Sequence, residues 1–340
     1  MAGPARLELA LLPTPLLKLG RLSRRLGVEV YLKRDDLTGL LESGNKVRKL
    51  EFLVGEALQQ RADTLITCGP LESNGCLAVA AVAARLGLRA LLAVEGERPT
   101  TYDGTLLLDR LLGAEVRYCS PAEFTRAGEV MEALAAEVAE RGGRPYVIPE
   151  SGANEVGALG YLECAVELAE QAQHGAPRFD AVVISAGSGG SQAGLLLGKQ
   201  LAGLAGEIVG VPLARPAAFV RDHVVRTMEA AIRRFGFSID VPGTVHLLDG
   251  YQGAGRAEVR DDELALVVEL GREEGVLLDP FYTARGFRAL VDTLSRDRKA
   301  LGSRVCFIHT GGLHSLFPFR ERLSGLLEPG EVQPKASRAD

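Results

Sequence analysis

A lysine near the start of the chain has the surroundings of a reactive amine. Lys46 follows Gly44 and Asn45, a pair typical of a loop that enters a helix. A lysine at the edge of a cleft can lose its proton and bond covalently to an aldehyde. Arg48 and Lys49 follow closely, however. The residues by themselves therefore favour a second interpretation, in which Lys46 belongs to a solvated cationic face at a helix start.

A glycine-rich segment has the composition of an anion-binding loop. Residues 186–191 read Ala-Gly-Ser-Gly-Gly-Ser and lie between an apolar stretch and a helical pattern. Glycines let backbone N–H groups converge, and a helix start adds positive potential, so the segment could hold a phosphate, with Ser188 and Ser191 as further donors. The spacing is neither a dinucleotide-binding fingerprint nor a P-loop, and a tight structural turn explains the pattern equally well.

A third segment, Glu72-Ser73-Asn74-Gly75, follows a predicted strand and precedes a predicted helix. Backbone N–H groups at this helix start, together with the side chains of Ser73 and Asn74, could bind a carboxylate. The alternative is that these residues only cap the helix. Spacing alone favours that alternative.

Short apolar runs alternate with longer amphipathic stretches, which predicts parallel sheets covered by helices, an α/β fold. Residues 180–185 are nearly all apolar, as expected of a central parallel strand. Composition marks no linker and therefore places no domain boundary. Strands are predicted at residues 28–33, 63–67, 89–94, 115–119, 145–148, 180–185, 207–211 and 304–309, and helices at residues 77–86, 104–112, 122–141, 155–171, 192–201, 221–234 and 262–274.

Bulk composition excludes several classes of protein. Of the 340 residues 46% are hydrophobic and 24% charged, and the net charge of −5 argues against nucleic acid as a partner. The five cysteines form no C-x-x-C pair, and His223, His246 and His314 lack metal-ligand spacing, so we expect neither disulfides nor a metal. The first ten residues lack the features of a secretory leader, and no apolar run approaches about 20 residues. We expect a cytoplasmic protein without a membrane partner.

Several longer motifs occur in order along the chain. They are Leu-Pro-Thr-Pro-Leu at residues 12–16, Leu-Lys-Arg-Asp-Asp-Leu at 32–37, Ser-Gly-Asn-Lys-Val-Arg-Lys-Leu-Glu-Phe at 43–52, Ala-Asp-Thr-Leu-Ile-Thr at 62–67, Gly-Arg-Pro-Tyr-Val-Ile-Pro at 143–149, Gly-Ala-Leu-Gly-Tyr at 157–161, Leu-Leu-Asp-Pro-Phe-Tyr-Thr at 277–283 and Phe-Ile-His-Thr-Gly-Gly at 307–312. Through these motifs nearly the whole chain resembles the 1-aminocyclopropane-1-carboxylate deaminases and D-cysteine desulfhydrases, which are pyridoxal-phosphate (PLP) enzymes of fold type II.

The resemblance implies how the cofactor PLP would be bound. Lys46 would hold the PLP aldehyde covalently, and Asn45 would hydrogen-bond the ring hydroxyl. Thr283 and Thr310 would lie near the ring nitrogen. The phosphate would be held by Ala186, Gly187, Ser188, Gly189, Gly190 and Ser191.

The resemblance also implies the catalytic and substrate-binding residues. Ser73 and Asn74 would bind the carboxylate of an amino-acid substrate, beside Gly75, and Ser73 is also a candidate proton carrier. Tyr251 and Tyr282 would face the substrate. The catalytic set is then Lys46, Ser73, Tyr251 and Tyr282.

The two threonines separate the two branches of the family. The deaminase branch has glutamate where Thr283 stands and leucine where Thr310 stands, so this chain resembles the desulfhydrase branch. A carboxylate keeps the ring nitrogen protonated and makes the ring a strong electron sink, whereas a hydroxyl leaves the nitrogen closer to neutral. We therefore expect hydroxyls, and no carboxylate, at the nitrogen. The weaker sink suffices when a good leaving group departs.

Three segments depart from the family's pattern. Gly75-Cys76-Leu77 replaces a His or Gln and a basic run, residues 252–256 replace Gly-x-Pro-Asn, and Ala284-Arg285 replaces Gly-Lys. We expect free space beside Ser73, and positive charge from Arg256 and Arg285 near the mouth of the site. Both changes favour a substrate other than D-cysteine, one with a second anionic group. The alternative is that neighbouring side chains fill the space and D-cysteine remains the substrate.

The resemblance implies two open, twisted, mostly parallel sheets with flanking helices and PLP in the cleft between two domains. Residues 1–54 with 156–340 would form the large PLP-binding domain and residues 55–155 the small one. The expected activity is α,β-elimination on a small amino acid, as in D-cysteine desulfhydrase, by a homodimer. The alternatives are aminocyclopropane deamination, cysteate lyase activity, β-replacement, and a non-catalytic sensor that binds PLP or an amino acid.

Overall fold

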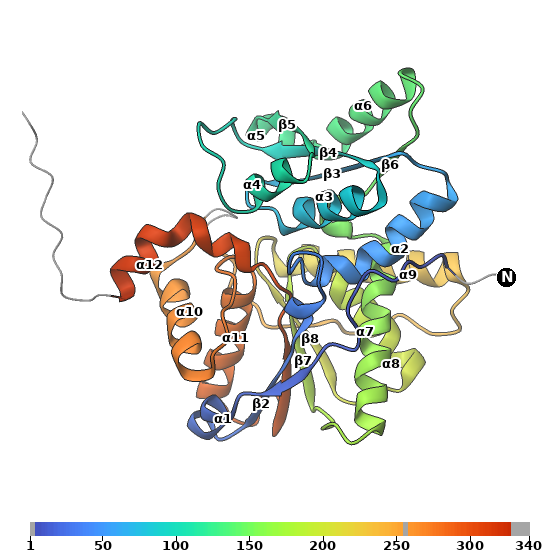
Figure 1. The fold of residues 1–340 in the computed structure, drawn as a ribbon. Helices are drawn as coiled ribbons and strands as arrows, with labels where there is room; N and C mark the ends of the chain where they lie inside the picture. The colour runs from blue at the N-terminus through green and yellow to red at the C-terminus, as the bar shows by residue number, and fades with distance from the viewer. Residues whose placement is uncertain (1–3, 254–257, 328–340) are drawn as a thin grey trace, which may run out of the picture.

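The computed structural model describes residues 4–253 and 258–327, which fold into two β-sheets flanked by helices (Figure 1). The larger sheet contains, from edge to edge, β1 (Leu16–Lys18), β2 (Glu29–Lys33), β10 (Arg304–Ile308), β7 (Ala181–Ala186), β8 (Glu207–Pro212) and β9 (His246–Leu247), and the smaller sheet β5 (Glu115–Cys119), β4 (Arg89–Glu95), β3 (Thr64–Pro70) and β6 (Pro145–Val147). Only β1 runs antiparallel to its neighbour among these strands. The predicted fold class is confirmed.

The central strand β7 shows why the larger sheet is covered on both faces. Val182 and Ile184 point into one hydrophobic core, and Ala181 and Val183 point into the other, as the alternation of a strand requires. The first core is built with α2 (Asn45–Gln59), α7 (Glu155–Gln173), α8 (Gly190–Ala202) and α9 (Ala217–Phe235), and the second with α1 (Gly20–Leu26), α10 (Asp261–Glu274) and α11 (Thr283–Arg296).

The smaller sheet is also sandwiched. Ile66 on β3 packs against Met131 and Leu134 of α6 (Ala127–Glu140), whereas Leu65 faces the core that contains α3 (Asn74–Leu86). The remaining helices are α4 (Gly104–Leu111), α5 (Pro121–Phe124) and α12 (Arg320–Leu327), with 3-10 turns η1 (Asp35–Leu37), η2 (Glu150–Gly152) and η3 (Leu313–Phe319). None of the described helices has both the length and the apolar character that a membrane crossing requires.

Two differences from the sequence-based assignment have clear causes. The single helix predicted at residues 122–141 is wrong: Ser120 caps the short helix α5 with Pro121 in its first position, and Arg126, at φ −116°, breaks the helical conformation before α6.

Helix α11 was not predicted. Its cap is the Asp279 carboxylate, which accepts hydrogen bonds from the backbone N–H groups of Tyr282 and Thr283, so the usual cap directly before the helix is missing. The short edge strands β1 and β9 and the helix α1 were missed as well.

Candidate active site

A pocket lies where the carboxyl ends of β3, β7 and β10 approach one another between the two sheets. Four helices begin at its wall: α2 with Asn45, α3 with Asn74, α8 with Gly190 and α11 just after Tyr282. Open α/β sheets bind ligands at such strand ends, and several converging helix starts favour a ligand with anionic groups. Most, but not all, of the residues singled out in the sequence line this pocket.

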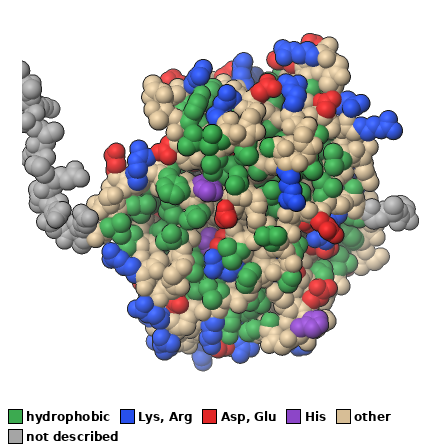
Figure 2. Space-filling view, in the orientation of Figure 1, with side chains coloured by type: hydrophobic (Ala, Val, Ile, Leu, Met, Phe, Trp, Pro, Cys, Tyr) green, Lys and Arg blue, Asp and Glu red, His purple; other side chains and the backbone are tan. Residues whose placement is uncertain are grey.

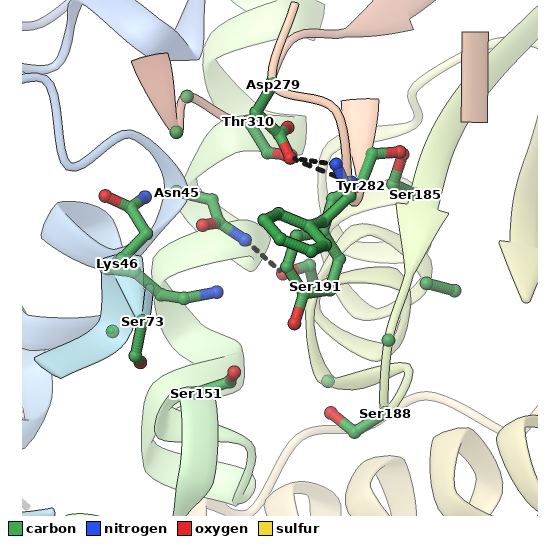
Figure 3. Close-up of a pocket in the computed structure, with 18 of the residues that line it drawn as sticks. Asn45, Lys46, Ser73, Ser151, Ser185, Ser188, Ser191, Asp279, Tyr282 and Thr310 are labelled. Carbon is green, nitrogen blue, oxygen red and sulfur yellow. Dashed lines mark hydrogen bonds between the residues drawn. The ribbon is translucent and has the colours of Figure 1, made fainter. Parts of the chain in front are cut away.

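Lys46 reaches into this pocket from the first turn of α2, and its amine lies among the labelled serines in Figure 3. Burial lowers the pKa of Lys46 to about 8, against the opposing effect of the Glu150 and Asp279 carboxylates, which raise it. The structure thus places Lys46 in a cleft and not on a solvated face. Part of its amine is therefore unprotonated near neutral pH, far more than for a lysine in solution, as a nucleophilic lysine requires.

A second lysine, which the sequence analysis did not select, lies one helical turn further along α2. Lys49 is buried and donates a hydrogen bond of 3.1 Å to the carbonyl oxygen of Ser151. Burial and the nearby Lys46 hold the pKa of Lys49 well below its usual range. A Cβ placed on Gly190 would lie 3.6 Å from its amine, so Lys49 faces the start of α8. The spacing of three residues on one helix was a signal that could have found it.

The glycine-rich loop forms a backbone cradle at the end of β7. Gly189 has φ +98°, and a Cβ there would lie 2.6 Å from Cγ2 of Val224, so a side chain would disturb the turn. Helix α8 then starts at Gly190, and its first N–H groups have no partner within the helix. Ala186, Gly187, Ser188, Gly189, Gly190 and Ser191 all line the pocket, as expected for this loop. Asn45 Nδ2 reaches Ser191 Oγ at 3.5 Å and joins the loop to α2.

The Ser73-Asn74-Gly75 segment lines the pocket beside Lys46. Ser73 Oγ accepts the N–H of Cys76, so Ser73 does cap α3, yet its hydroxyl hydrogen stays available. Asn74 uses its amide N–H₂ on the carbonyl oxygen of Ser43, while its Oδ1 is buried without a partner in the described part of the chain. A substrate carboxylate would therefore meet the Ser73 hydroxyl and the helix N–H groups, and Asn74 would offer an acceptor.

Gly75 leaves space at the lysine. A Cβ there would lie 3.6 Å from Cε of Lys46 and 3.8 Å from Cα of Ser151. Ser151 lines the same part of the pocket with φ +60°, an uncommon conformation for a residue other than glycine, and Glu150 is its neighbour. Neither residue could have been selected from the sequence, because glutamate and serine are not residue types that indicate a left-handed backbone.

The predicted partners of the ring nitrogen are separated by the structure. Thr310 lines the pocket, whereas Thr283 is fully buried behind the wall and donates its hydroxyl to Asp279 Oδ2 at 2.6 Å. Asp279 itself lines the pocket. A buried aspartate thus stands next to Thr310 in the pocket wall (Figure 3), whereas hydroxyls as the partners of the ring nitrogen stay a prediction.

The two tyrosines also differ. The Tyr282 ring lies in the pocket, 3.6 Å from where a Cβ on Gly187 would stand, and its backbone is held by Asp279 Oδ1 and Ser185 Oγ, each at 2.8 Å (Figure 3). Tyr251 lies outside this pocket, in a surface depression, where its hydroxyl contacts Asp292 Oδ2 at 3.3 Å. The structure therefore does not bring Tyr251 to the substrate position that the sequence resemblance implied.

The expected positive charge at the mouth of the site needs correction. Arg285 is buried, its Nε donates to Glu263 Oε1 at 2.6 Å, and its other nitrogens bond to the carbonyl oxygens of Leu213 and Glu258. Its charge is neutralised inside the fold. Arg256 and the neighbouring positions 254–257 lie outside the described residues. Arg285 gives no support to an anionic extension of the substrate.

These residues fit PLP. A buried amine whose pKa is about 8 suits an aldehyde, and a glycine cradle with a second buried lysine suits a phosphate. Asn74 Oδ1 is a buried acceptor without a hydrogen-bond partner in the described part of the chain, and a donor on a ligand could satisfy it. No cluster of His, Cys, Asp and Glu that could hold a metal occurs within residues 4–253 and 258–327. Fold and pocket together define a PLP-dependent enzyme of fold type II.

Comparison with known proteins leads to the same class. The family model "Pyridoxal-phosphate dependent enzyme" matches residues 7–311. A D-cysteine desulfhydrase of Klebsiella pneumoniae is 39% identical over 323 residues, which cover 94% of this chain and 97% of that protein. A Thermotoga maritima protein, provisionally named a 1-aminocyclopropane-1-carboxylate deaminase, is 38% identical over 94% of this chain and 99% of its own length. A solved ACC deaminase homologue has a TM-score of 0.86 and 34% identity, with 95% and 96% of the two chains covered.

The chain belongs to the pyridoxal-phosphate dependent enzyme family, and its cofactor is PLP.

Proposed function

We propose that the protein catalyses α,β-elimination on a small amino acid, as a D-cysteine desulfhydrase does. With cysteine and water the products are pyruvate, ammonia and sulfide. One observation carries the proposal: the amine of Lys46, with a pKa of about 8, faces a pocket that has an anion cradle on one side and the start of α3 on the other. The similarity to the Klebsiella pneumoniae desulfhydrase supports the choice of reaction.

The cofactor contacts follow from the chemistry of the wall. Lys46 takes the aldehyde, Lys49 and the N–H groups of the loop 186–191 take the phosphate, and Asn45 is the nearby amide for the ring hydroxyl. When bound, PLP supplies an electron sink for the charge left on the α-carbon. Lys46 is the base that removes the α-proton, because burial lowers its pKa to about 8 and so leaves part of its amine neutral.

The substrate-side residues orient the amino acid. The Ser73 hydroxyl and the N–H groups at the start of α3 hold the carboxylate, with the helix dipole in its favour. Asn74 Oδ1 accepts a hydrogen bond from the substrate, and the Tyr282 ring covers the side of the pocket above Gly187. The space beside Gly75 receives the β-substituent, which is the leaving group.

The reaction is tested by incubating the PLP-loaded protein with D-cysteine, L-cysteine, D-serine, cysteate and 1-aminocyclopropane-1-carboxylate, and identifying the keto acid. We expect pyruvate with sulfide from D-cysteine, and none from the Lys46→Ala variant. Release of 2-oxobutyrate from the cyclopropane would instead establish a deaminase, and pyruvate with sulfite a cysteate lyase. If none of the five compounds gives a keto acid, the proposal of elimination is contradicted. Products that form only when a second nucleophile is added would establish β-replacement.

We propose further that residues 55–155 form a small domain which closes over the remainder, because the four strands of the small sheet fall within that range and the pocket lies between the two sheets. The five buried free cysteines support a cytoplasmic location, because disulfides are rare in that reducing compartment.

We propose a homodimer as well. Neighbouring segments carry exposed apolar side chains: Leu107 and Leu111 on α4, Phe317 on the adjacent turn η3, and Leu41, whose carbonyl oxygen contacts His314 of η3. Figure 2 shows hydrophobic side chains gathered on the same face that carries α4 in Figure 1. Such a patch is typical of an interface between subunits. Light scattering at micromolar concentration should give twice the mass of 36.2 kDa, whereas the mass of a single chain would contradict the dimer.

A further inference from the structure

Asp279 is a carboxylate that all its contacts hold in the ionised form. Oδ1 accepts the N–H groups of Phe281 and Tyr282 at 3.0 and 2.8 Å, and Oδ2 accepts the N–H and the hydroxyl of Thr283 at 2.8 and 2.6 Å. These four donors occupy the roughly four lone-pair sites of a carboxylate. The group is 2% exposed and lies in the pocket wall.

No cation neutralises this carboxylate directly. The buried carboxylates of Asp35, Glu51, Glu167 and Glu263 each contact a lysine or arginine. No lysine or arginine nitrogen lies within 4.0 Å of Asp279 in the described part of the chain. His309 lies close by and acts to lower the pKa of Asp279, and its ring nitrogens contact the carbonyl oxygen of Leu277 and the N–H of Gly311.

Asp109 shows what burial does when donors are missing. Its Oδ1 has no partner among the described residues, and burial raises the pKa of Asp109 to about 8, so it is protonated and neutral at pH 7. Burial also raises the pKa of Asp279 above its usual value, although Thr283, the backbone N–H groups and His309 act to lower it. What distinguishes Asp279 is its geometry: it has a full set of hydrogen-bond donors, and no lysine or arginine is bonded to it in the described part of the chain. A buried charge of this kind is costly unless a cation arrives with a ligand.

Thr283 holds the Asp279 carboxylate in place from behind the pocket wall. Its hydroxyl has one hydrogen, which goes to Asp279 Oδ2, and its oxygen accepts the N–H of Asp279 at 2.7 Å. Thr283 can therefore only accept, and cannot donate, a further hydrogen bond.

The place that a bound PLP would give its ring nitrogen follows from its other contacts. Lys46 would hold the aldehyde carbon, which is opposite the nitrogen in the pyridine ring, and the loop 186–191 would hold the phosphate. The side that remains is built by Asp279 and Thr310, at the top of the pocket in Figure 3.

We infer that Asp279 is the counter-charge of a protonated ring nitrogen, acting as a fixed anion in the pocket wall that Thr283 holds from behind. This inference rests on the proposed PLP site. It makes the ring a strong electron sink even though threonines stand where the deaminase branch has glutamate and leucine. The proton comes from solvent when the cofactor binds. Asp279 is a positioning residue that acts on the electronic state of the cofactor.

The test uses the holoenzyme loaded with PLP that carries ¹⁵N in the ring, and records the ¹⁵N chemical shift, because protonated and neutral pyridine nitrogens resonate in well-separated ranges. We expect the native protein at pH 7.5 in the protonated range. Asp279→Asn keeps the shape but removes the charge, and should move the signal towards the neutral range. Asp297→Asn, which removes an exposed carboxylate at the other end of α11, should leave the signal unchanged.

Each outcome is decisive. A neutral nitrogen in the native holoenzyme overturns the inference without any variant, so the test does not depend on whether Asp279→Asn folds. A protonated nitrogen that survives in a folded Asp279→Asn holoenzyme overturns it as well. Absence of any bound PLP in the native protein would overturn the proposed function together with this inference, whereas bound PLP with a neutral nitrogen contradicts this inference alone.

Discussion

The amine of Lys49 donates a hydrogen bond of 3.1 Å to the carbonyl oxygen of Ser151. This bond holds a buried lysine against the start of α8, where the phosphate of the cofactor is expected. Replacement of Lys49 by Met should lower PLP affinity about ten- to hundredfold, because a hydrogen bond to a charged group contributes about 1.5–3 kcal/mol. An absorbance titration measures the change. Lys199→Met, near the other end of α8, is the control, and equal affinity of the two variants would contradict the role of Lys49.

The pKa of Lys46 predicts how PLP incorporation depends on pH. The neutral amine is the reactive form, so the rate constant for incorporation should rise with pH and level off above about 8. The Glu150 carboxylate raises this pKa, so Glu150→Gln should move the midpoint to lower pH. Stopped-flow absorbance at a series of pH values follows the reaction. Glu155→Gln, at the start of α7, should keep the native midpoint; a Glu150→Gln midpoint that stays in place or rises would show that Glu150 does not act on Lys46.

Gly189 and Gly203 lie at opposite ends of α8, and both have positive φ, +98° and +64°. Alanine at either position should cost about 1–2 kcal/mol in backbone strain, which thermal unfolding measures. Only at Gly189 would the new Cβ press on Val224, at 2.6 Å, and displace the phosphate cradle. We therefore expect a large loss of PLP affinity for Gly189→Ala and little loss for Gly203→Ala. Equal affinity in both would place the phosphate elsewhere.

Ser73 has two roles that a matched pair of variants can separate. Ser73→Ala removes a helix cap and should lower the free energy of unfolding by about 1 kcal/mol. It also removes the hydroxyl that would hold the substrate carboxylate, so KM should rise as well. Ser120→Ala removes the cap of α5, away from the pocket, and should affect stability without changing KM. If KM is unaltered in Ser73→Ala, the substrate carboxylate lies at another position.

Part of the fold and of the candidate site was predictable because local patterns suffice for it. The apolar run at β7 followed by glycines predicts a buried strand and a turn into α8, and the structure has both. The local pattern around Lys46 favoured a solvated face, and only the resemblance to a known family selected this residue. The place of Asp279 was not predictable, because its carboxylate caps α11 from four residues before Thr283. Sequence spacing does not show which of these two side chains faces the pocket.

Long-range pairing explains the other misjudged residues. From the sequence, Arg285 was expected to be a free cation near the site. In the structure it is paired with Glu263, which lies 22 residues earlier. Tyr251 reads as a substrate contact, but its hydroxyl contacts Asp292 on α11. Both depend on partners far away along the sequence, which no local pattern identifies.

The central claim is that Lys46, and not its buried neighbour Lys49, carries the cofactor. Borohydride reduction of the PLP-loaded protein fixes the cofactor to its lysine, and peptide mass spectrometry with fragmentation locates the added phosphopyridoxyl group. The account predicts the group on Lys46, with no fixed cofactor in the Lys46→Ala variant. A phosphopyridoxyl group on Lys49 or on any other lysine of the native protein would contradict it.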